Sequence, residues 1–219
     1  MQEVLRHLPR TLHGRLIAAK LAAIAVLVIV LAEVSLVARL ETELTQTIHG
    51  LTVGWLTGLV SGVTELGGTT IVLGVTAVAV LALVALRHWR GAVALAIAVL
   101  GTQLAVSVGK VLMTRPRPDD GSAVADPSGW SFPSGHSASA AALYVMLALI
   151  ATTLWRRQLR PAVAFAVAGT LVAVVGLSRV YLGAHYPTDV LAGWLVGGVL
   201  VVGAWAACSR LPAPQLRAA

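Results

Sequence analysis

Six long apolar runs dominate this sequence and restrict it to a small set of folds. Each run is close to the roughly 20 residues that an α-helix needs to cross the hydrocarbon core of a bilayer. Inside that core the backbone must satisfy its own hydrogen bonds, which favours helices for runs of this length. The predicted helices cover residues 16–38, 69–87, 92–113, 137–155, 162–181 and 189–208. We therefore expect an all-α integral membrane protein with a bundle of six transmembrane helices.

The composition supports this expectation. Apolar residues make up 58% of the 219 residues, above the roughly 45–50% that is typical of soluble domains. This length fits a single membrane domain over residues 1–219, with a short N-terminal arm at 1–15 and a short tail at 209–219. The first run follows basic residues, but it is longer than the about 7–15 apolar residues of a signal peptide. It is therefore predicted to be a retained helix.

The charged residues between the runs predict a topology. Basic residues gather in every second connection and in both terminal segments, whereas acidic residues prevail in the other connections. By the positive-inside rule, both termini should be cytoplasmic. The net charge is +7, but no basic stripe alternates with aromatic residues, so a nucleic-acid partner is not expected. Cys208 is the single cysteine and cannot form an internal disulfide.

Residues 40–66 fit a membrane span poorly. The stretch is rich in glycine and threonine and contains LTVGWLTGLVSGV. We expect a short amphipathic or re-entrant piece on the outer face instead. Glu33, near the outer end of the first predicted helix, has no assigned role.

Three polar clusters sit at the ends of the predicted helices, where ionisable residues are costly and need a reason. They cover Lys110–Pro118, Phe132–Ser139 and Ser178–Asp189. In the predicted topology all three fall on the outer side. The clusters are therefore expected to converge on one patch at the outer face.

The residue types in this patch favour a phosphate-like ligand. Lys110, Arg117 and Arg179 are cations that would repel one another unless an anion lay between them. Arginine offers planar paired donors that suit phosphate, and lysine offers a point charge. Ser134 and Gly135 open a predicted helix, whose free N–H groups favour an anion. The patch is thus predicted to bind phosphate.

Two histidines and an aspartate could perform chemistry on that phosphate. His185 and Asp189 are four residues apart, so the carboxylate can reach the imidazole and fix its tautomer. The free ring nitrogen of His185 would then be a nucleophile, and His136 would protonate the leaving oxygen and activate water. The same three residues are also a possible metal-ligand set, although nearby cations oppose this. A purely structural polar network is the other alternative.

The motifs resemble those of the type 2 phosphatidic acid phosphatase (PAP2) superfamily. Its signature is K-x6-R-P, P-S-G-H and S-R-x5-H-x3-D, and this chain matches every fixed position, spacing and order. The matching segments are Lys110-VLMTRP-Arg117-Pro118, Pro133-Ser134-Gly135-His136 and Ser178-Arg179-VYLGA-His185-YPT-Asp189. The resemblance is close over residues 110–189. The spacing selects Arg117 as the phosphate ligand and leaves Arg115 as an auxiliary or interfacial residue.

The resemblance implies a metal-independent phosphatase without a cofactor, which forms a phosphohistidine intermediate. In such an enzyme His185 is the nucleophile, Asp189 orients it and His136 is the general acid. The implied phosphate ligands are Lys110, Arg117, Ser134, Gly135 and Arg179. Thr64–Gly68 also resembles the family's approach to its second helix. The superfamily includes soluble vanadium haloperoxidases, but the six apolar runs favour its membrane lipid phosphatases.

We therefore expect a bacterial inner-membrane enzyme that hydrolyses a lipid phosphomonoester or pyrophosphate at the periplasmic or extracellular face. Candidate substrates are phosphatidic acid, phosphatidylglycerol phosphate and a polyprenyl pyrophosphate of the undecaprenyl type. The sequence does not choose among them. A transporter would need polar residues along a path to the cytoplasm, and a non-enzymatic lipid-binding protein would not need the nucleophile.

Overall fold

The structure, a computed structural model, describes residues 20, 23–24, 35–50, 52–118 and 129–210. Every regular element in these ranges is a helix. The elements are α3 (Ser35–Gly50), α4 (Gly54–Thr64), the short 3₁₀-helix η1 (Glu65–Gly67), α5 (Thr69–Ala85), α6 (Trp89–Met113), α7 (Gly135–Leu154), α8 (Pro161–Tyr181) and α9 (Pro187–Cys208). The expectation of an all-α fold is confirmed for these residues.

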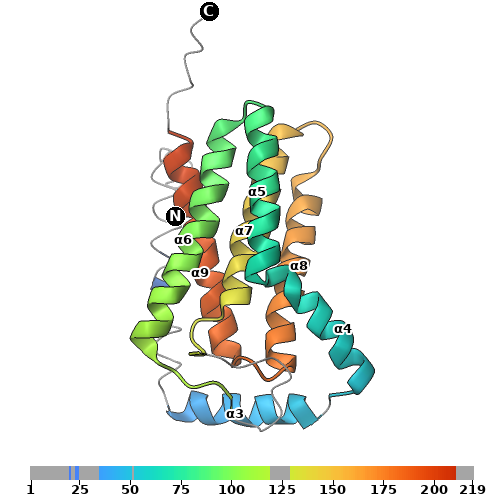
Figure 1. Cartoon of the computed structure of the whole chain (residues 1–219), viewed down its shortest axis with the longest axis vertical. Coiled ribbons are helices and arrows are strands. Elements are labelled where there is room, and N and C mark those ends of the chain that lie inside the picture. The colour runs from blue at the N-terminus through green and yellow to red at the C-terminus, as the bar shows by residue number, and fades with distance from the viewer. Residues whose placement is uncertain (1–19, 21–22, 25–34, 51, 119–128, 211–219) are drawn as a thin grey trace, which may run out of the picture.

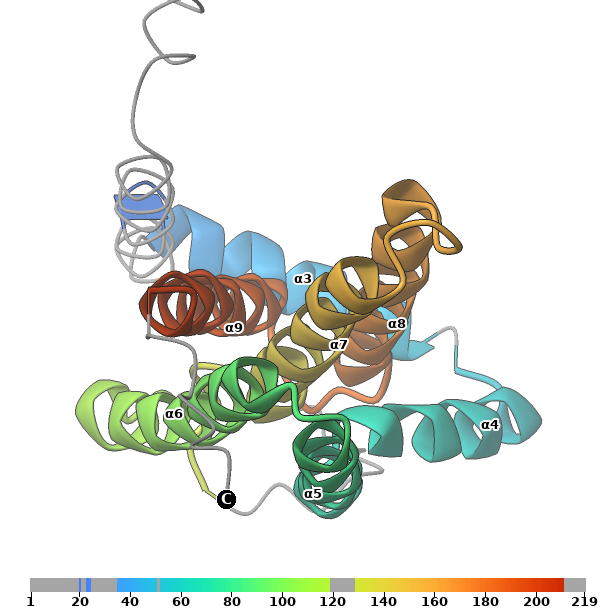
Figure 2. The same ribbon diagram turned by 90° about the horizontal axis from the view of Figure 1, so that it is seen from above.

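The long helices form an upright bundle, and α3 lies across one end of it (Figure 1). The α7 helix occupies the middle, where it contacts α5, α6, α8 and α9. Seen from above, α6 and α9 lie on one side of α7, while α4 and α8 lie toward the other (Figure 2). The connections that contain the three motif clusters are all at the end of the bundle that α3 crosses.

Glycines allow α7 and α9 to approach closely. A methyl group at Gly193 would lie 2.6 Å from the Ser134 carbonyl oxygen, and one at Gly197 would lie 2.5 Å from the Ala138 carbonyl oxygen. These two glycines are one turn apart on α9, so they form a small-residue face of the kind that membrane helices use for close packing. This contact places the first turn of α7 directly beside the first turn of α9.

Among the described residues, four helices are long and apolar enough to cross a membrane, namely α6, α7, α8 and α9. The α4–η1 segment and α5 pass the same test as a pair that is bent by 44°, which gives up to five spans in the described residues. The predicted runs at 69–87, 92–113, 137–155, 162–181 and 189–208 correspond to α5 through α9 within a few residues. The run at 16–38 lies almost wholly outside the described residues, and its last residues, from Ser35 onward, belong to α3. Glu33 and the terminal arm also lie outside them.

The segment at 40–66 contains two helices with a break between them. The α3 helix buries Glu41 and Thr45 against the bundle end and exposes Leu40 and Leu44. It therefore has the amphipathic character expected of this segment. The α4 helix leads obliquely into η1 and α5 (Figure 1).

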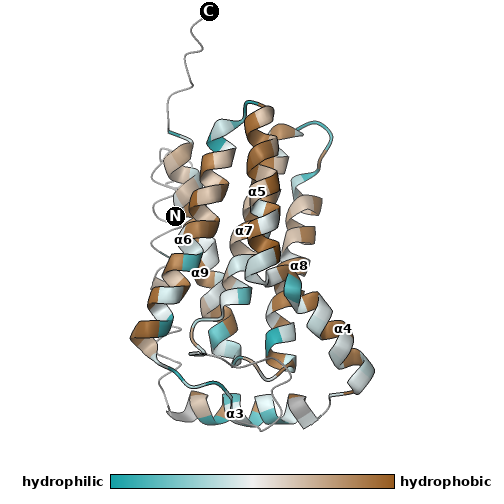
Figure 3. Cartoon of the chain, viewed as in Figure 1, coloured by the Kyte–Doolittle hydropathy of each residue, from teal (hydrophilic) through white to brown (hydrophobic). Residues whose placement is uncertain are grey.

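Hydropathy changes along the bundle axis. Brown apolar residues cover the middle of the helices, and teal polar residues gather toward the two ends (Figure 3). Such a distribution is what a bilayer selects, because its core is apolar and its surfaces are wet. The structure is that of an integral membrane protein.

Candidate functional site

Backbone contacts tie the three motif segments together at the α3 end of the bundle. The Ser134 N–H donates to the Asp189 carbonyl oxygen at 3.0 Å, which joins the start of α7 to the start of α9. The Arg117 guanidinium donates to the Ala184 carbonyl oxygen at 2.7 Å, which joins the segment after α6 to the segment before α9. The three segments that the sequence separates by tens of residues are therefore neighbours.

His185 lies between a carboxylate and a guanidinium. Its Nδ1 atom is 3.4 Å from Asp189 Oδ2, which is an ion-pair distance rather than a formed hydrogen bond. Its Nε2 atom is 3.3 Å from the Arg117 guanidinium, which can only donate. We infer that Nε2 has a free lone pair and that Nδ1 carries the proton toward Asp189. This is the tautomer that a nucleophilic Nε2 requires.

His185 is buried, with 2% of its surface exposed. Burial lowers the pKa of His185 to about 4, and although Asp189 raises it, Arg117 and Arg179 lower it further. The imidazole is therefore neutral at neutral pH, as a nucleophile must be.

Ser134 caps the first turn of α7. Its hydroxyl oxygen accepts from the Ser137 N–H at 3.4 Å and lies 2.9 Å from the Ser137 hydroxyl oxygen. Gly135 and His136 follow as the first helical residues, both half-buried. The first turn of a helix presents unpaired N–H groups, so this turn suits an anion. The charges of Arg179, Lys110 and Arg117 all act on His136.

Lys110 and Arg117 are held by backbone carbonyl groups. Lys110 Nζ donates to the Trp130 carbonyl oxygen at 2.8 Å. Arg117 Nε donates to the Gly129 carbonyl oxygen at 3.1 Å, in addition to the contact with Ala184. A carbonyl oxygen orients a cation without cancelling its charge, so Lys110 can still pair with an anion.

Arg179 is the most buried cation of the site, with 6% of its surface exposed. It donates to the Thr64 hydroxyl oxygen at 3.2 Å, and among the described residues its Nε–H has no acceptor. Glu65 acts on its charge only at longer range, and in the described part of the chain no carboxylate lies within ion-pair distance of it. A buried guanidinium with an unused donor is costly. The arrangement therefore fits a site that receives an anion.

A second group of residues holds Asp189, and most of its members are not predicted by the sequence motifs. Arg115 Nη1 donates to Asp189 Oδ1 at 2.7 Å, so the residue that the motif spacing left as auxiliary or interfacial contacts the site's aspartate. The Ser131 hydroxyl and the Tyr186 N–H, the latter at 2.9 Å, donate to Asp189 Oδ2. Glu41 on α3 lies 2.7 Å from the Arg115 guanidinium. No motif spacing points to Ser131 or Glu41.

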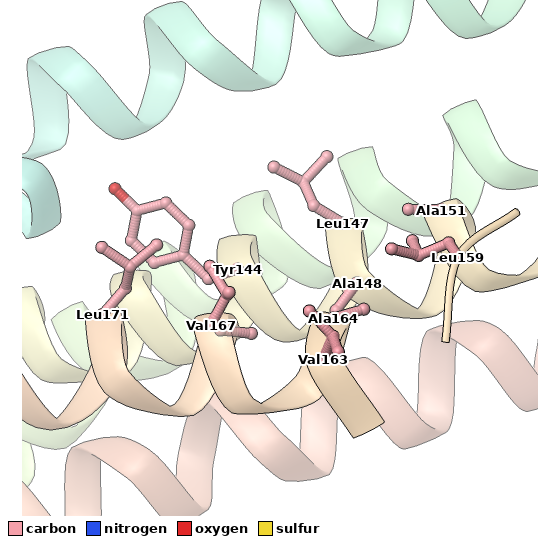
Figure 4. A pocket seen from close by; sticks show the side chains of 10 residues that line it. Tyr144, Leu147, Ala148, Ala151, Leu159, Val163, Ala164, Val167 and Leu171 are labelled. Carbon is pink, nitrogen blue, oxygen red and sulfur yellow. The ribbon is translucent and has the colours of Figure 1, made fainter. Parts of the chain in front are cut away.

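An apolar groove lies between α7 and α8, apart from these residues (Figure 4). It has a volume of about 320 Å³. It begins at Tyr144, eight residues or about 12 Å along α7 from His136, and extends away from it. Its lining residues are Tyr144, Leu147, Ala148, Ala151, Leu159, Val163, Ala164, Val167, Ala168 and Leu171. None of these can pair with a phosphate charge, so the groove is not the phosphate site.

Comparisons with known proteins agree with this geometry. The sequence profile of the PAP2 superfamily matches residues 90–211, more than half of the chain. The chain belongs to the PAP2 superfamily. Phosphatidylglycerophosphatase B of Bacillus subtilis is 36% identical over 149 residues, which cover 67% of this chain and 72% of that protein. The resemblance inferred from the three motifs is thereby confirmed.

Two further comparisons bear on substrate and fold. An undecaprenyl-diphosphatase of Sulfolobus acidocaldarius is 40% identical over 72 residues, which cover 32% of this chain and 30% of that protein. The crystal structure of a transmembrane PAP2 type phosphatidylglycerolphosphate phosphatase from Bacillus subtilis superposes with a TM-score of 0.82 at 24% identity. That alignment covers 91% of this chain and 98% of the other. This PAP2 chain therefore has the fold of a membrane phosphatase.

Proposed function

We propose that this PAP2 protein hydrolyses the phosphomonoester or pyrophosphate of a membrane lipid, without a metal ion, through a phosphohistidine intermediate. The observation that carries this proposal is the arrangement around His185. One ring nitrogen faces the buried Asp189 carboxylate, and the other faces Arg117 on the side where a phosphate would bind. The named activities of the relatives, which are phosphatases, support the same reaction class.

In the first step, Nε2 of His185 attacks the phosphorus atom, and the bond between phosphorus and the lipid oxygen breaks. His136 donates a proton to that oxygen as it leaves. Positive charge then builds on the His185 ring, and the Asp189 carboxylate at 3.4 Å stabilises it. Lys110, Arg117 and Arg179 stabilise the negative charge on the non-bridging phosphoryl oxygens.

In the second step, a water molecule attacks the phosphohistidine. His136, now neutral, accepts a proton from this water, and the bond between Nε2 and phosphorus breaks. Inorganic phosphate leaves, and His185 returns to its neutral form with the Nδ1 proton toward Asp189. Ser134 and Gly135, at the start of α7, hold the phosphate through both steps.

We also propose that six helices cross the bacterial inner membrane and that the site faces the periplasm or the extracellular side. The connections at the end opposite the site contain many arginines, and the positive-inside rule assigns such an end to the cytoplasm. The described arginines there are Arg87, Arg90, Arg156, Arg157, Arg160 and Arg210. Both termini are then cytoplasmic, and the whole chain is one membrane domain.

The substrate is a lipid phosphate, and we propose a glycerophospholipid phosphate or a prenyl pyrophosphate. The phosphatidylglycerophosphatase relative favours the first, and the undecaprenyl-diphosphatase relative favours the second over a shorter alignment. The lipid chains enter laterally between the helices, because helix surfaces beside the site are apolar. A panel of phosphatidic acid, phosphatidylglycerol phosphate and undecaprenyl pyrophosphate, compared by kcat/KM, identifies the preferred headgroup.

The mechanism is tested with protein purified in detergent. Phosphate release should persist with EDTA present, and acid-quenched samples with a ³²P-labelled lipid should contain an acid-labile label on the protein. His185→Ala should abolish both the label and turnover. Loss of wild-type turnover in EDTA, or normal turnover by His185→Ala, would contradict the histidine mechanism.

The topology is tested by labelling single cysteines in intact cells, in a background where Cys208 is replaced by alanine. A membrane-impermeant maleimide should label Glu43→Cys on the exposed side of α3 directly. It should label Arg156→Cys, in the connection between α7 and α8, only after the cells are permeabilised. The reverse pattern would place the site in the cytoplasm.

A further inference from the structure

Arg115 and Glu41 form a buried charge pair next to the catalytic aspartate, outside the residues assigned to phosphate or to the reaction. Arg115 places Nη1 2.7 Å from Asp189 Oδ1 and Nη2 2.7 Å from Glu41 Oε2. Its side chain is 11% exposed, and the Glu41 and Asp189 side chains are 6% and 0% exposed. In such a setting charges interact strongly, because little water screens them.

The geometry of Arg115 is fixed on several sides. Its guanidinium stacks on the Tyr186 ring at 4.4 Å and donates to the Thr188 hydroxyl oxygen at 2.9 Å. Glu41 in turn accepts the Thr188 N–H at 2.7 Å, which satisfies an otherwise unpaired donor in the first turn of α9. Arg115 thus holds one carboxylate oxygen of Asp189, while Ser131 and the Tyr186 N–H hold the other.

The charges explain why both residues are needed. If Arg115 alone contacted Asp189, its positive charge would cancel the carboxylate that His185 needs when its ring becomes cationic. Glu41 pairs with the same guanidinium, so the group of Asp189, Arg115 and Glu41 keeps one net negative charge. That charge lies on the Nδ1 side of His185, opposite the phosphate-binding cations.

We propose that Arg115 and Glu41 are positioning residues that act on catalysis through Asp189: Arg115 fixes its carboxylate, and Glu41 keeps the charge beside His185 negative. This inference rests on the proposed function. It also gives α3 a role, because Glu41 on this helix accepts the Thr188 N–H at the start of α9.

Other charged groups face His185 from the elements around it, and they remain in place in the variants that test the proposal. Asp189 comes from α9, Arg117 from the segment after α6, Arg179 from α8 and His136 from α7. Lys110 on α6 acts on Asp189 and His136. The variants below change only the charge behind Asp189.

The experiment compares Glu41→Gln and Arg115→Met with the wild type, using phosphatidylglycerol phosphate in detergent micelles or whichever lipid the substrate panel selects. Each variant should lower kcat by about 10- to 100-fold. KM should change by less than about threefold, because neither residue contacts the phosphate. Arg115→Lys keeps the charge but not the paired donors, so it should recover part of kcat.

The pH profile separates positioning from a merely structural role. Glu41→Gln leaves the charge group neutral, so it should move the acid limb of kcat/KM to lower pH. Arg115→Met leaves two carboxylates unneutralised, so it should move the same limb to higher pH. We expect shifts of roughly half a pH unit or more in opposite directions.

Matched controls come from the same helix. Glu43→Gln and Arg39→Met change exposed residues of α3 and should leave kcat and the pH profile unchanged. If Arg115→Met does not fold, Arg115→Lys and Glu41→Gln carry the comparison. Shifts in the same direction, or variants that behave like the controls, would overturn the proposal while the wild type still releases phosphate. If the wild type itself releases none, the proposed function fails instead.

Discussion

Replacing Arg179 by methionine should stabilise the empty protein and abolish its response to phosphate. Arg179 is 6% exposed and, within the part of the chain that the structure describes, makes one hydrogen bond, to Thr64, and leaves its Nε–H unpaired. An uncompensated buried charge costs several kcal/mol, and Arg117 nearby adds repulsion. Methionine fills a similar volume without that cost.

The expected increase in the free energy of unfolding of Arg179→Met is the difference between opposing contributions. The substitution removes the burial cost of the charge but loses the Thr64 hydrogen bond, which is worth about 1 kcal/mol, and the longer-range attraction to Glu65. We expect a net stabilisation of about 2 kcal/mol. In a chain of this size each kcal/mol corresponds to about 2–4 °C in Tm, so Tm should rise by about 4–8 °C.

The assay is thermal unfolding in detergent with EDTA, followed by the fluorescence of the six tryptophans. Inorganic phosphate at 100 times its Kd should stabilise the wild type by about 2.7 kcal/mol. It should have little effect on Arg179→Met, which should also be nearly inactive. Arg156→Met, at an exposed position, should match the wild type in both measurements. A lower Tm for Arg179→Met together with a normal phosphate response would refute the reasoning that this arginine is an unpaired anion ligand.

Three further predictions concern packing, pH and a single hydrogen bond. Gly197→Leu should lower Tm strongly because any side chain meets the Ala138 carbonyl oxygen at 2.5 Å, whereas Gly198→Leu, with open space around it, should not. Burial lowers the pKa of His185 to about 4, below its unfolded value, so the wild type should lose stability as pH falls from 6.5 toward 4. Between pH 7 and pH 4.5 the loss attributable to this residue is about 2 kcal/mol, and it should be absent in His185→Gln, as urea unfolding at the two pH values can show. Tyr144→Phe removes a 2.8 Å hydrogen bond to the carbonyl group of Leu66 and should cost about 1 kcal/mol in the same assay. Equal pH dependence in both proteins, or an unchanged stability for Tyr144→Phe, would contradict these two expectations.

Much of the bundle was predictable because apolar runs have a simple physical meaning. Five of the six predicted helices correspond to helices of the structure, from α5 to α9. The remaining predicted helix, at residues 16–38, lies almost wholly outside the described residues. The glycine contact between α7 and α9 was not predicted, since Gly193 and Gly197 are two of 21 glycines and their partners are backbone atoms of another helix.

The site was predictable only where sequence spacing encodes geometry. His185 and Asp189 are four residues apart at the start of a helix, so their contact follows from local structure. Arg115 and Arg117 are two residues apart in an irregular segment, and spacing from Lys110 selected only Arg117. The structure shows that Arg115 contacts Asp189, which depends on how the chain turns after α6 and is not visible in a local pattern.

The role of Glu41 is a second example of a contact that a local sequence pattern does not predict. It lies two residues from Glu43 in an amphipathic helix, and nothing in the sequence separates the two. The structure does, because Glu41 is 5% exposed and bonded to Arg115 and to the Thr188 N–H, whereas Glu43 is exposed. Only the way α3 crosses the bundle end decides which glutamate reaches α9.

The charges of the site are sorted by sign around His185, and this explains how a membrane protein tolerates them. The buried carboxylates Asp189 and Glu41 lie on the Nδ1 side, share the Arg115 guanidinium and keep one net negative charge. On the Nε2 side, Arg117 contacts the Gly129 and Ala184 carbonyl oxygens, and Arg179 contacts the Thr64 hydroxyl oxygen. A transferred phosphoryl group would meet positive charge in front of the nucleophile and leave negative charge behind it, so the same arrangement favours both attack and the cationic intermediate. The cations destabilise the protein when no phosphate is bound. The stability of Arg179 variants therefore tests whether this arginine binds the phosphate.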